Sequence, residues 1–443
     1  MTDATFLSGL AAELDVRLAA ADERLRTAYP GEPATRQPVH TVYVPADRYT
    51  PDTVPAWGRR ALAALAEHGR TATEFADALG LPPRTAAEVY DQVRAKLARE
   101  PVEDLRIDFE DGYGHRPDAD EDAAARTAAK ALAEATAAGA GSPFCGIRFK
   151  SFEAPTRRRG LRTLAIFLET LGPPPGGFVV TLPKVTSVEQ VEAMALAAGR
   201  LEAAYGLASG SLRFELQVET PQAILGADGV SPLPSMIRAS AGRCAGLHYG
   251  TYDYSAALGV SAAYQSAEHP VADHAKAVMQ VAAAGTGVRV CDGSSNVLPV
   301  GDGDDVRAAW RLHARLVLRA LEGGVYQGWD LHPGQLPSRY AAVHSFFREG
   351  LPAAAARLRG YRERRTSGFL DEPATVRAMA GFLDEPATVR AMACFLDEPA
   401  TVRAMAGFLA RGLDCGAIGA AELGALAGVT PSELRAMRAG TGG

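Results

Sequence analysis

The chain has 443 residues, of which 47% are hydrophobic and 22% are charged, as in ordinary folded globular proteins. Disordered and fibrous classes are therefore excluded. The formal net charge is −6 and no dense Lys/Arg run interleaves with aromatic residues, so we expect no nucleic-acid partner. The N-terminus has neither the basic region nor the apolar stretch of a leader, and no apolar run approaches 18 residues, which predicts no secretion and no membrane span.

The cysteines are odd in number and widely spaced, and no CxxC pair occurs. This pattern argues against a disulfide framework or a zinc ribbon and fits a reducing, cytoplasmic location. Small-molecule chemistry is therefore the favoured class of function. The five are Cys145, Cys244, Cys291, Cys394 and Cys415.

The N-terminal segment, residues 1–39, is predicted to be helical. An amphipathic pattern over residues 5–28 indicates the helix, and a Pro/Gly-rich link over 29–38 follows it. A catalytic domain is expected from residue 40 to residue 350. Within it, an insert at about 68–103 reads as two helices, which we interpret as a surface decoration or an oligomer contact. Its Gly-Leu-Pro-Pro turn is similar to that of a helix-turn-helix, but the segment is not basic, so DNA binding is not expected.

Eight β-rich runs alternate with Ala-rich helical stretches in the predicted catalytic domain. Nearly continuous apolar character in strands separated by helices is typical of a closed parallel barrel, so the expected fold is α/β, a (β/α)₈ TIM barrel. A doubly wound open sheet is the alternative, although no GxGxxG follows any of the runs. In chain order the runs are TVYVPA, LRIDFE, CGIRFK, FVVTLPK, LRFELQVET, AGLHYGTYD, GVRVCDG and YQGWDLHP.

A helical C-terminal extension is predicted over residues 351–443. It contains tandem 13-residue repeats over 368–406, GFLDEPATVRAMA twice and then CFLDEPATVRAMA, whose near-identity indicates recent duplication. Each copy places Asp and Glu before Pro, a favourable helix start, and each Pro interrupts a longer helix. We therefore expect short broken helices and interpret the extra copies as a tolerated insertion.

The candidate functional residues are the polar side chains that end the predicted strands, because TIM-barrel active sites lie at that end of the barrel. So many carboxylates at one mouth would repel one another unless cations were present, and oxygen ligands without sulfur or clustered imidazole favour Mg²⁺ or Mn²⁺. In strand order the residues are Asp47 and Arg48, Glu110 and Asp111, Arg148 and Lys150, Lys184, Glu219, Asp253, Asp292, and Asp330 with His332.

Each of these residues also has a purely structural interpretation. A carboxylate at a strand end is often the N-cap of the next helix. Arg148 and Lys184 could simply pair with carboxylates inside the barrel, and His332 before Pro333 could be a packing histidine. Glu219 is less open to the capping interpretation, because Thr220 follows it and can act as the cap.

With the strand ends aligned, the sequence resembles the citrate lyase β-subunit and malyl-CoA lyase group of the HpcH/HpaI aldolase superfamily, as a divergent member. The resemblance covers about residues 40 to 335, and its segments occur in the family's order. They are VYVPADR for the family's VPG-x-R, IDFEDGYG for LDLEDAV, GIRFK for VRVN, TLPKV for LPKV, QVETPQAI for the strand of the metal glutamate, HYGTYDYSAALG for FGxxDL, and WDLHPGQ for IHPxQ.

The resemblance implies that Glu219 and Asp253 hold a divalent ion and that Arg148 grips the substrate carboxylate. It places Glu110 and Asp111 beside the metal. Arg48 and His332 are further substrate-binding candidates, and Lys184 is a further catalytic one. The sequence departs from the family at GYG after the Glu-Asp pair, at RFK, and in the long insert, so both a free acid and a coenzyme A thioester stay open as substrates.

The leading hypothesis is thus a Mg²⁺-dependent carbon–carbon lyase or aldolase that acts through an enolate on a small carboxylate or its acyl-CoA thioester. One alternative is a Schiff-base aldolase using Lys184 or Lys150, which the surrounding carboxylates oppose by raising the lysine pKa. Another is a catalytically silent barrel that serves as a binding scaffold. The resemblance also implies a homo-oligomer in which a C-terminal segment covers a neighbour's barrel mouth.

Deletion of residues 381–406 tests the interpretation of the repeats. The deletion joins Ala380 to Gly407 and so restores the junction that follows the last copy. Because loop-closure cost changes slowly with length, we expect the free energy of unfolding to change by about 1 kcal/mol or less, measured by urea denaturation. Activity and metal dependence should be retained. A variant that folds and binds metal but loses turnover would show that the repeats belong to the active site.

Overall fold

Eight parallel strands close into a barrel in the computed structural model, which confirms the predicted TIM-barrel fold. Each strand pairs with the next along the chain, and β8 returns to β1, where Val42 pairs with Asp330. All eight runs identified in the sequence form these strands. They are β1 (His40–Pro45), β2 (Asp104–Asp108), β3 (Phe144–Arg148), β4 (Phe178–Leu182), β5 (Arg213–Val218), β6 (Cys244–Tyr249), β7 (Arg289–Ser294) and β8 (Gln327–Asp330).

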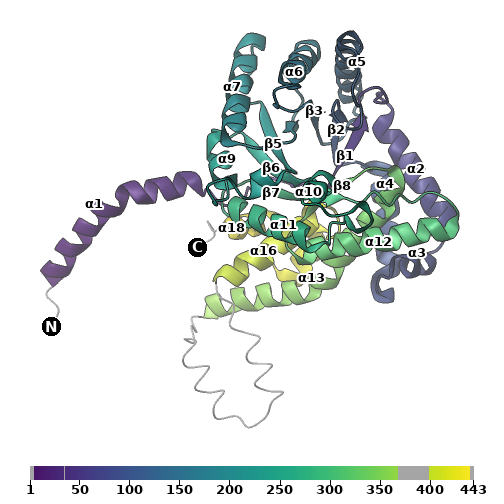
Figure 1. Cartoon of the computed structure of the whole chain (residues 1–443). Coiled ribbons are helices and arrows are strands. Elements are labelled where there is room, and N and C mark those ends of the chain that lie inside the picture. Colours follow the sequence, from purple (N-terminus) through teal and green to yellow (C-terminus); the bar gives the residue numbers. More distant parts are fainter. Residues whose placement is uncertain (1–3, 34, 368–398, 440–443) are drawn as a thin grey trace.

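Helices surround the barrel and extend it at both ends of the chain (Figure 1). The structure describes residues 4–33, 35–367 and 399–439. The helices and short 3₁₀ turns are α1 (Ala4–Ala28), α2 (Thr53–His68), α3 (Ala72–Leu79), η1 (Pro83–Thr85), α4 (Ala86–Arg99), α5 (Asp118–Ala137), α6 (Arg157–Leu171), α7 (Val188–Tyr205), α8 (Pro221–Ile224), α9 (Leu233–Ala239), α10 (Thr251–Ala257), η2 (Ala262–Tyr264), α11 (Pro270–Ala283), α12 (Gly303–Glu322), η3 (Pro333–Gln335), α13 (Leu336–Ser367), α16 (Pro399–Asp414), α17 (Ala420–Ala427) and α18 (Pro431–Ala439).

The inside of the barrel is polar. In β2, the buried residues Leu105 and Ile107 alternate with buried charged residues, so the two sets point to opposite sides of the sheet. Arg106 from β2 donates to Glu215 of β5 at 2.8 Å and to Thr181 of β4 at 3.2 Å, across strands that do not neighbour β2. Charged side chains therefore fill the barrel by pairing with one another, which is how buried charges are tolerated.

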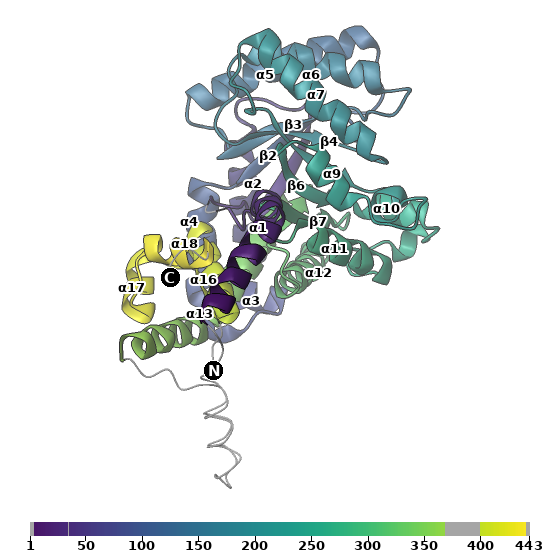
Figure 2. The same ribbon diagram turned by 90° about the vertical axis from the view of Figure 1, so that its left-hand side faces the viewer.

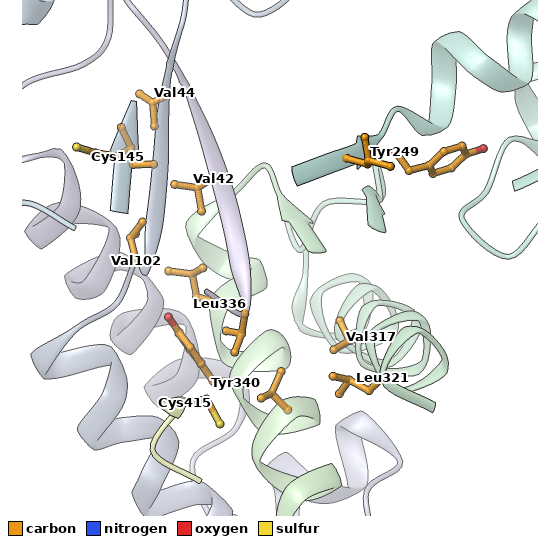
Figure 3. Close-up of a cluster of buried hydrophobic side chains, with 14 of the residues drawn as sticks. Val42, Val44, Val102, Cys145, Tyr249, Val317, Leu321, Leu336, Tyr340 and Cys415 are labelled. Carbon is orange, nitrogen blue, oxygen red and sulfur yellow. The ribbon is translucent and has the colours of Figure 1, made fainter. Parts of the chain in front are cut away.

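The apolar core lies between the barrel and the surrounding helices. Figure 3 shows part of it, where Val42 of β1 lies near Leu336 and Tyr340 of α13 and Cys415 of the C-terminal segment. These side chains are almost fully buried. The described part of the C-terminal extension is thus built into the core of its own chain.

The C-terminal helices pack at the end of the barrel where the strands begin. The Tyr340 hydroxyl donates to the carbonyl of Pro101, which precedes β2, at 3.0 Å. Arg411 of α16 stacks on Tyr326, which precedes β8, with its guanidinium carbon 4.1 Å from the ring centre. α16 begins at Pro399 inside the third repeat copy, as the sequence predicts. The expectations for residues 368–398 fall outside the described part of the chain.

The N-terminal helix α1 projects away from the barrel (Figures 1 and 2). Its apolar side chains are exposed, among them Phe6, Leu10 and Leu14. The predicted helix is therefore present, and its apolar face has no covering element among the described residues. None of the described helices has the length and apolar character that crossing a bilayer requires.

The insert after the first barrel helix forms α3 and α4, the two helices that the sequence predicts. Both pack within this chain, α3 against α12 and α4 against α13. The Phe75 ring of α3 lies edge-on to Trp310 of α12, with ring centroids 5.5 Å apart. In this chain the insert covers two barrel helices.

Asp330 at the end of β8 is fully buried in an ionic network. Its carboxylate lies 2.9 Å from Nδ1 of His40, 3.0 Å from Nε2 of His313 and 2.8 Å from a guanidinium nitrogen of Arg339. Burial alone would raise the Asp330 pKa, but Arg339 and the two histidines hold it well below its usual value. The network joins β1, β8, α12 and α13.

We expect Asp330→Ala to lower the free energy of unfolding by about 3–5 kcal/mol, because the buried guanidinium of Arg339 loses its counter-charge. Urea denaturation measures this change. Asp304→Ala is the matched control, since Asp304 pairs with Arg307 at the surface with 93% of its side chain exposed. The control should cost far less. Equal losses in the two variants would contradict the structural role of the network.

Candidate active site at the strand ends

Five neighbouring strands, β2 to β6, bring the predicted site residues to one end of the barrel. Arg148 is the last residue of β3, and Lys184 and Glu219 follow β4 and β5. Glu110 and Asp111 follow β2, so they lie in the turn beside Arg148. Asp253 lies in the first turn of α10, directly after β6. Parallel strands end at the same edge, and that is why residues from 110 to 253 meet here.

The ammonium of Lys184 is the centre of the cluster. Its Nζ lies 2.8 Å from Asp253 and 3.2 Å from Glu110. It is also 3.4 Å from Asp111 and 4.0 Å from Glu219. Burial would lower the Lys184 pKa, but Glu219 and Glu110 outweigh it and hold the pKa well above its usual value. The ammonium of Lys184 is therefore the shared counter-charge of four carboxylates.

The backbone of Lys184 is unusual as well. Its φ is 51°, in the left-handed region that residues other than glycine rarely adopt. In this conformation the Lys184 N–H donates to Oε1 of Glu219 at 2.9 Å. Both the main chain and the side chain of Lys184 are thus turned toward the acidic cluster. Such strained positions persist only where the surroundings enforce them, and they concentrate at functional sites.

Arg148 is held by Asp108, which accepts two hydrogen bonds from its guanidinium, both of 2.7 Å. Its remaining nitrogen, Nη1, lies 3.4 Å from Glu110 and 3.7 Å from Asp111. The guanidinium carbon also lies 4.8 Å from the ring centre of Tyr43 and 5.6 Å from that of Trp329. The guanidinium of Arg148 is therefore fixed on one side by the Asp108 carboxylate and flanked by aromatic rings, while its Nη1 faces the mouth of the barrel.

Burial controls the protonation of the two inner carboxyl groups. Glu219 is 2% exposed, and burial raises its pKa to about 8 despite Lys184 and Arg148. Burial likewise raises the pKa of Glu110 to about 7, although Arg148 opposes the change. For Asp111, burial is outweighed by the hydrogen bond with Glu110 and by the two cations, so its pKa is lowered. The cluster has more carboxyl groups than the neighbouring cations neutralise.

Sequence reasoning missed several residues that shape this site. Asp108 fixes Arg148, and Gln217 donates to Glu219 through its side-chain amide. The rings of Tyr43 and Trp329 lie 4.3 Å apart beside the guanidinium. Alternation along β2 and β5 could have shown that Asp108 and Gln217 share the inner face with Arg106 and Glu215. The ring pair has no comparable pattern in the sequence.

Several other strand-end residues lie in different surroundings. Arg48 is exposed in the turn after β1, and Asp47 there pairs with Arg116 at 2.7 Å. Nδ1 of His332 accepts from the N–H of Gly334 at 3.1 Å and caps η3, while its Nε2 lies 3.3 Å from Arg60. None of these contacts joins the Lys184 cluster.

Lys150 and Asp292 are likewise engaged elsewhere. The Lys150 ammonium is bound by Glu121 at 2.7 Å and by the carbonyl of Phe109 at 2.8 Å. Asp292 pairs with Lys276 at 3.0 Å. Both residues are buried, so each pair neutralises charge within the protein.

The donor chemistry of the cluster suits a hard divalent cation, because every candidate ligand is a carboxylate. In the described residues, no three His, Cys, Asp or Glu side chains are grouped closely enough to form a ready-made ion site. The Lys184 ammonium lies between the carboxylates instead. The residues present therefore fit a divalent ion in chemistry, and such an ion would compete with Lys184 for the same oxygens.

Gly250→Ala should destabilise the site. A Cβ at Gly250 would lie 2.4 Å from the Cβ of Glu219, and neither atom has freedom to move away. We expect a loss of about 1–3 kcal/mol in the free energy of unfolding, measured by urea denaturation, as for other overpacked positions. Gly176→Ala is the control, because nothing lies within 4 Å of its added Cβ. A Gly250→Ala variant as stable as the control would show that Glu219 is not confined as described.

The described fold resembles several solved structures at low sequence identity. Malate synthase from Haloferax volcanii, in a complex with magnesium and glyoxylate, is 15% identical with a TM-score of 0.46, over 69% of this chain and 75% of that one. The citrate lyase β subunit from M. tuberculosis, in a complex with oxaloacetate and magnesium, is 18% identical with a TM-score of 0.41, over 70% and 98%. An HpcH/HpaI aldolase from Desulfitobacterium hafniense is 14% identical with a TM-score of 0.38, over 72% and 92%.

The last two proteins carry the names of the group that the strand-end motifs resemble, and the likeness is one of fold. No curated protein matches the chain significantly. A family model matches residues 18–394 and again residues 379–441, and the two matches overlap inside the repeats. Because these matches span nearly all of the sequence, the chain belongs to the family described as a domain of unknown function, DUF6986.

Proposed function

We propose that this chain is a Mg²⁺- or Mn²⁺-dependent carbon–carbon lyase or aldolase. Its substrate would be a small carboxylic acid or the coenzyme A thioester of one, and the reaction would pass through an enolate. The observation that carries the proposal is the convergence of Glu110, Asp111, Glu219 and Asp253 on one cation beside Arg148, at the end of the barrel where TIM-barrel active sites lie.

Arg148 is the residue that would bind the substrate carboxylate. Asp108 already takes two of its hydrogen bonds, so the guanidinium is oriented before substrate arrives and loses little freedom on binding. Its third nitrogen, Nη1, donates to Gln217 at 3.3 Å and faces the acidic cluster, 3.4 Å from Glu110. A bound carboxylate at Nη1 would thus lie next to the cation site.

Glu219 and Asp253 are the residues that would hold the divalent ion, with Glu110 and Asp111 beside them. When bound, the ion supplies positive charge for the oxyanion that develops as the carbon–carbon bond breaks or forms. Lys184 neutralises the same carboxylates and orients Glu219 through its N–H. Glu110 contacts both Lys184 and Arg148, and its inward carboxyl group is our candidate for moving a proton at Oε1.

A lysine aldolase is disfavoured by the surroundings of both lysines. A Schiff base requires a neutral amine, whereas the carboxylates around Lys184 hold its ammonium charged. Lys150 is buried and bound to Glu121, away from the mouth. The chemistry of the cluster therefore favours metal-assisted enolate formation.

Titration with Mn²⁺, followed by electron paramagnetic resonance, tests the metal site directly. We expect Glu219→Gln and Asp253→Asn each to weaken Mn²⁺ binding at least about ten-fold. Asp47→Asn is the control, since Asp47 pairs with Arg116 outside the cluster, and its affinity should be unchanged. Lys184→Met should bind Mn²⁺ at least as tightly as the parent, because the competing ammonium is gone. Equal Mn²⁺ binding by all four variants would contradict this assignment.

Activity is tested on a panel of 2-oxo acids, hydroxy acids and their coenzyme A thioesters, by mass spectrometry of the cleaved fragments. Chelation should abolish cleavage, and Mg²⁺ or Mn²⁺ should restore it. Arg148→Lys should raise KM, because an ammonium cannot keep the bidentate contact with Asp108 and reach the substrate carboxylate as well. If cleavage survives exhaustive chelation and borohydride adds substrate mass to Lys184, the protein is instead a lysine aldolase.

A further inference from the structure

A cavity lies at the opposite end of the barrel from the acidic cluster. Its volume is about 230 Å³, and it is bordered by the start of β7, the segment before β8, the link after α1, and helices α16 and α18. Figures 1 and 2 show α16 and α18 together at this end of the molecule. The residues that begin strands lie at the end of a TIM barrel that is not used for catalysis, so this cavity is separate from the strand-end site.

Three arginines and one carboxylate line the cavity. Arg289 begins β7, Arg411 belongs to α16 and Arg438 to α18, and Glu32 is the single acidic residue in the lining. Glu32 bonds to Arg438 at 2.9 Å and to Arg411 at 2.7 Å with the same oxygen. Half of the Glu32 side chain is exposed. This one carboxylate is shared between Arg411 and Arg438, and Arg289 has no bond to an acid among the described residues.

Two nitrogen atoms of these arginines are available for further hydrogen bonds. Nη1 of Arg438 and Nε of Arg411 are buried, and neither has a hydrogen-bond partner among the described residues. The side chain of Arg438 is only 5% exposed. A buried guanidinium nitrogen without a partner is costly, and a ligand oxygen would satisfy it.

The charges around the cavity are also unbalanced. Within the described part of the chain, the hydrogen bonds of the Arg289 side chain go to the carbonyl and hydroxyl oxygens of Thr35, both at 2.8 Å. Burial, together with the neighbouring charges of Arg438, Arg213 and Arg411, lowers the pKa of Arg289 to about 10. Asp414 is the one acid that opposes this shift, and it also pairs with Arg435 at 3.3 Å. Among the main charges that act on Arg289, arginines therefore outnumber acids.

We propose that this cavity binds a compact oxyanion of at least two negative charges, held between Arg289, Arg411 and Arg438. The volume admits a phosphate group or a small dicarboxylate. Guanidinium groups bind the oxygens of either ligand through charge-assisted hydrogen bonds. Because the three arginines come from β7, α16 and α18, a bound anion would join the C-terminal helices to the base of the barrel. The site does not depend on the proposed enzymatic function.

Binding to the full-length protein is measured by calorimetry with inorganic phosphate in one arm and malonate in the other, each against chloride at equal ionic strength. We expect saturable binding, a rise in Tm that saturates over the same concentration range, and slower amide exchange in α16 and α18. Saturation by phosphate alone identifies a phosphate-bearing ligand, and saturation by malonate alone identifies a carboxylate. Saturation by both identifies a general oxyanion site.

Variants give the decisive comparison. Arg438→Gln should weaken binding at least about ten-fold, whereas Glu32→Gln should strengthen it, because it removes the competing carboxylate. Arg307→Gln, at an exposed arginine paired with Asp304, should leave binding unchanged. If Arg438→Gln fails to fold, the opposite sign for Glu32→Gln still tests the site. The proposal is overturned if neither anion binds saturably, or if Glu32→Gln leaves the affinity unchanged.

Discussion

The central constraint in this molecule is the pairing of charges at the carboxyl end of the barrel, where Glu110, Glu219 and Arg148 are buried and the other members are partly exposed. Glu110, Asp111, Glu219 and Asp253 could not approach one another without the cations of Lys184 and Arg148 between them. The arrangement is costly to bury and contributes little to stability compared with an apolar filling. Its position at the carboxyl ends of the strands, where TIM-barrel active sites lie, agrees with the proposed function.

The same constraint extends down the barrel. Below the cluster, Arg106 bonds to Asp104 and Glu215, and His248 lies 3.0 Å from Glu215. An inner layer of this kind gives each strand a fixed register, because a slip of one residue would turn the charged side chains into the apolar layer outside. The polar interior thus helps to select one register of the strands, and the outer apolar layer supplies most of the favourable hydrophobic burial.

Much of this architecture could be predicted from the sequence. The eight strands and the two-helix insert follow from apolar runs separated by helical stretches, and Glu110, Arg148, Lys184 and Glu219 follow from their place at strand ends. The position of Asp253 was harder to predict, because it lies in the first turn of α10 and not on the strand. What joins these residues could not be predicted, since no periodic pattern encodes pairs between strands, such as Asp108 with Arg148 on neighbouring strands or Arg106 with Glu215 across the barrel.

The sequence also could not distinguish acids at the mouth from acids below it. Asp330 and Asp292 end apolar runs as Glu219 does, yet each is bound within the protein by basic groups from the helices outside the strands. Those partners, Arg339 and Lys276, lie 9 and 16 residues from them in the chain, so the contacts follow from how the helices pack. Burial alone does not distinguish the acids of the cluster from these structural acids, because Glu219 is as buried as Asp292 and Asp330.

The network around Asp330 has a consequence for synthesis of the chain. His40 of β1 and its partner Asp330 are 290 residues apart, and Arg339 of α13 follows later still. During translation, Nε2 of His40 can accept from the N–H of Glu103 early, but its Nδ1 lacks its acidic partner until nearly three quarters of the chain has been synthesised. The barrel closes only when β8 is available, so closure and the docking of α13 occur together and late. Until then, the open sheet would expose both of its edges. Nascent chains of this protein thus have a long interval in which chaperones would have to protect β1.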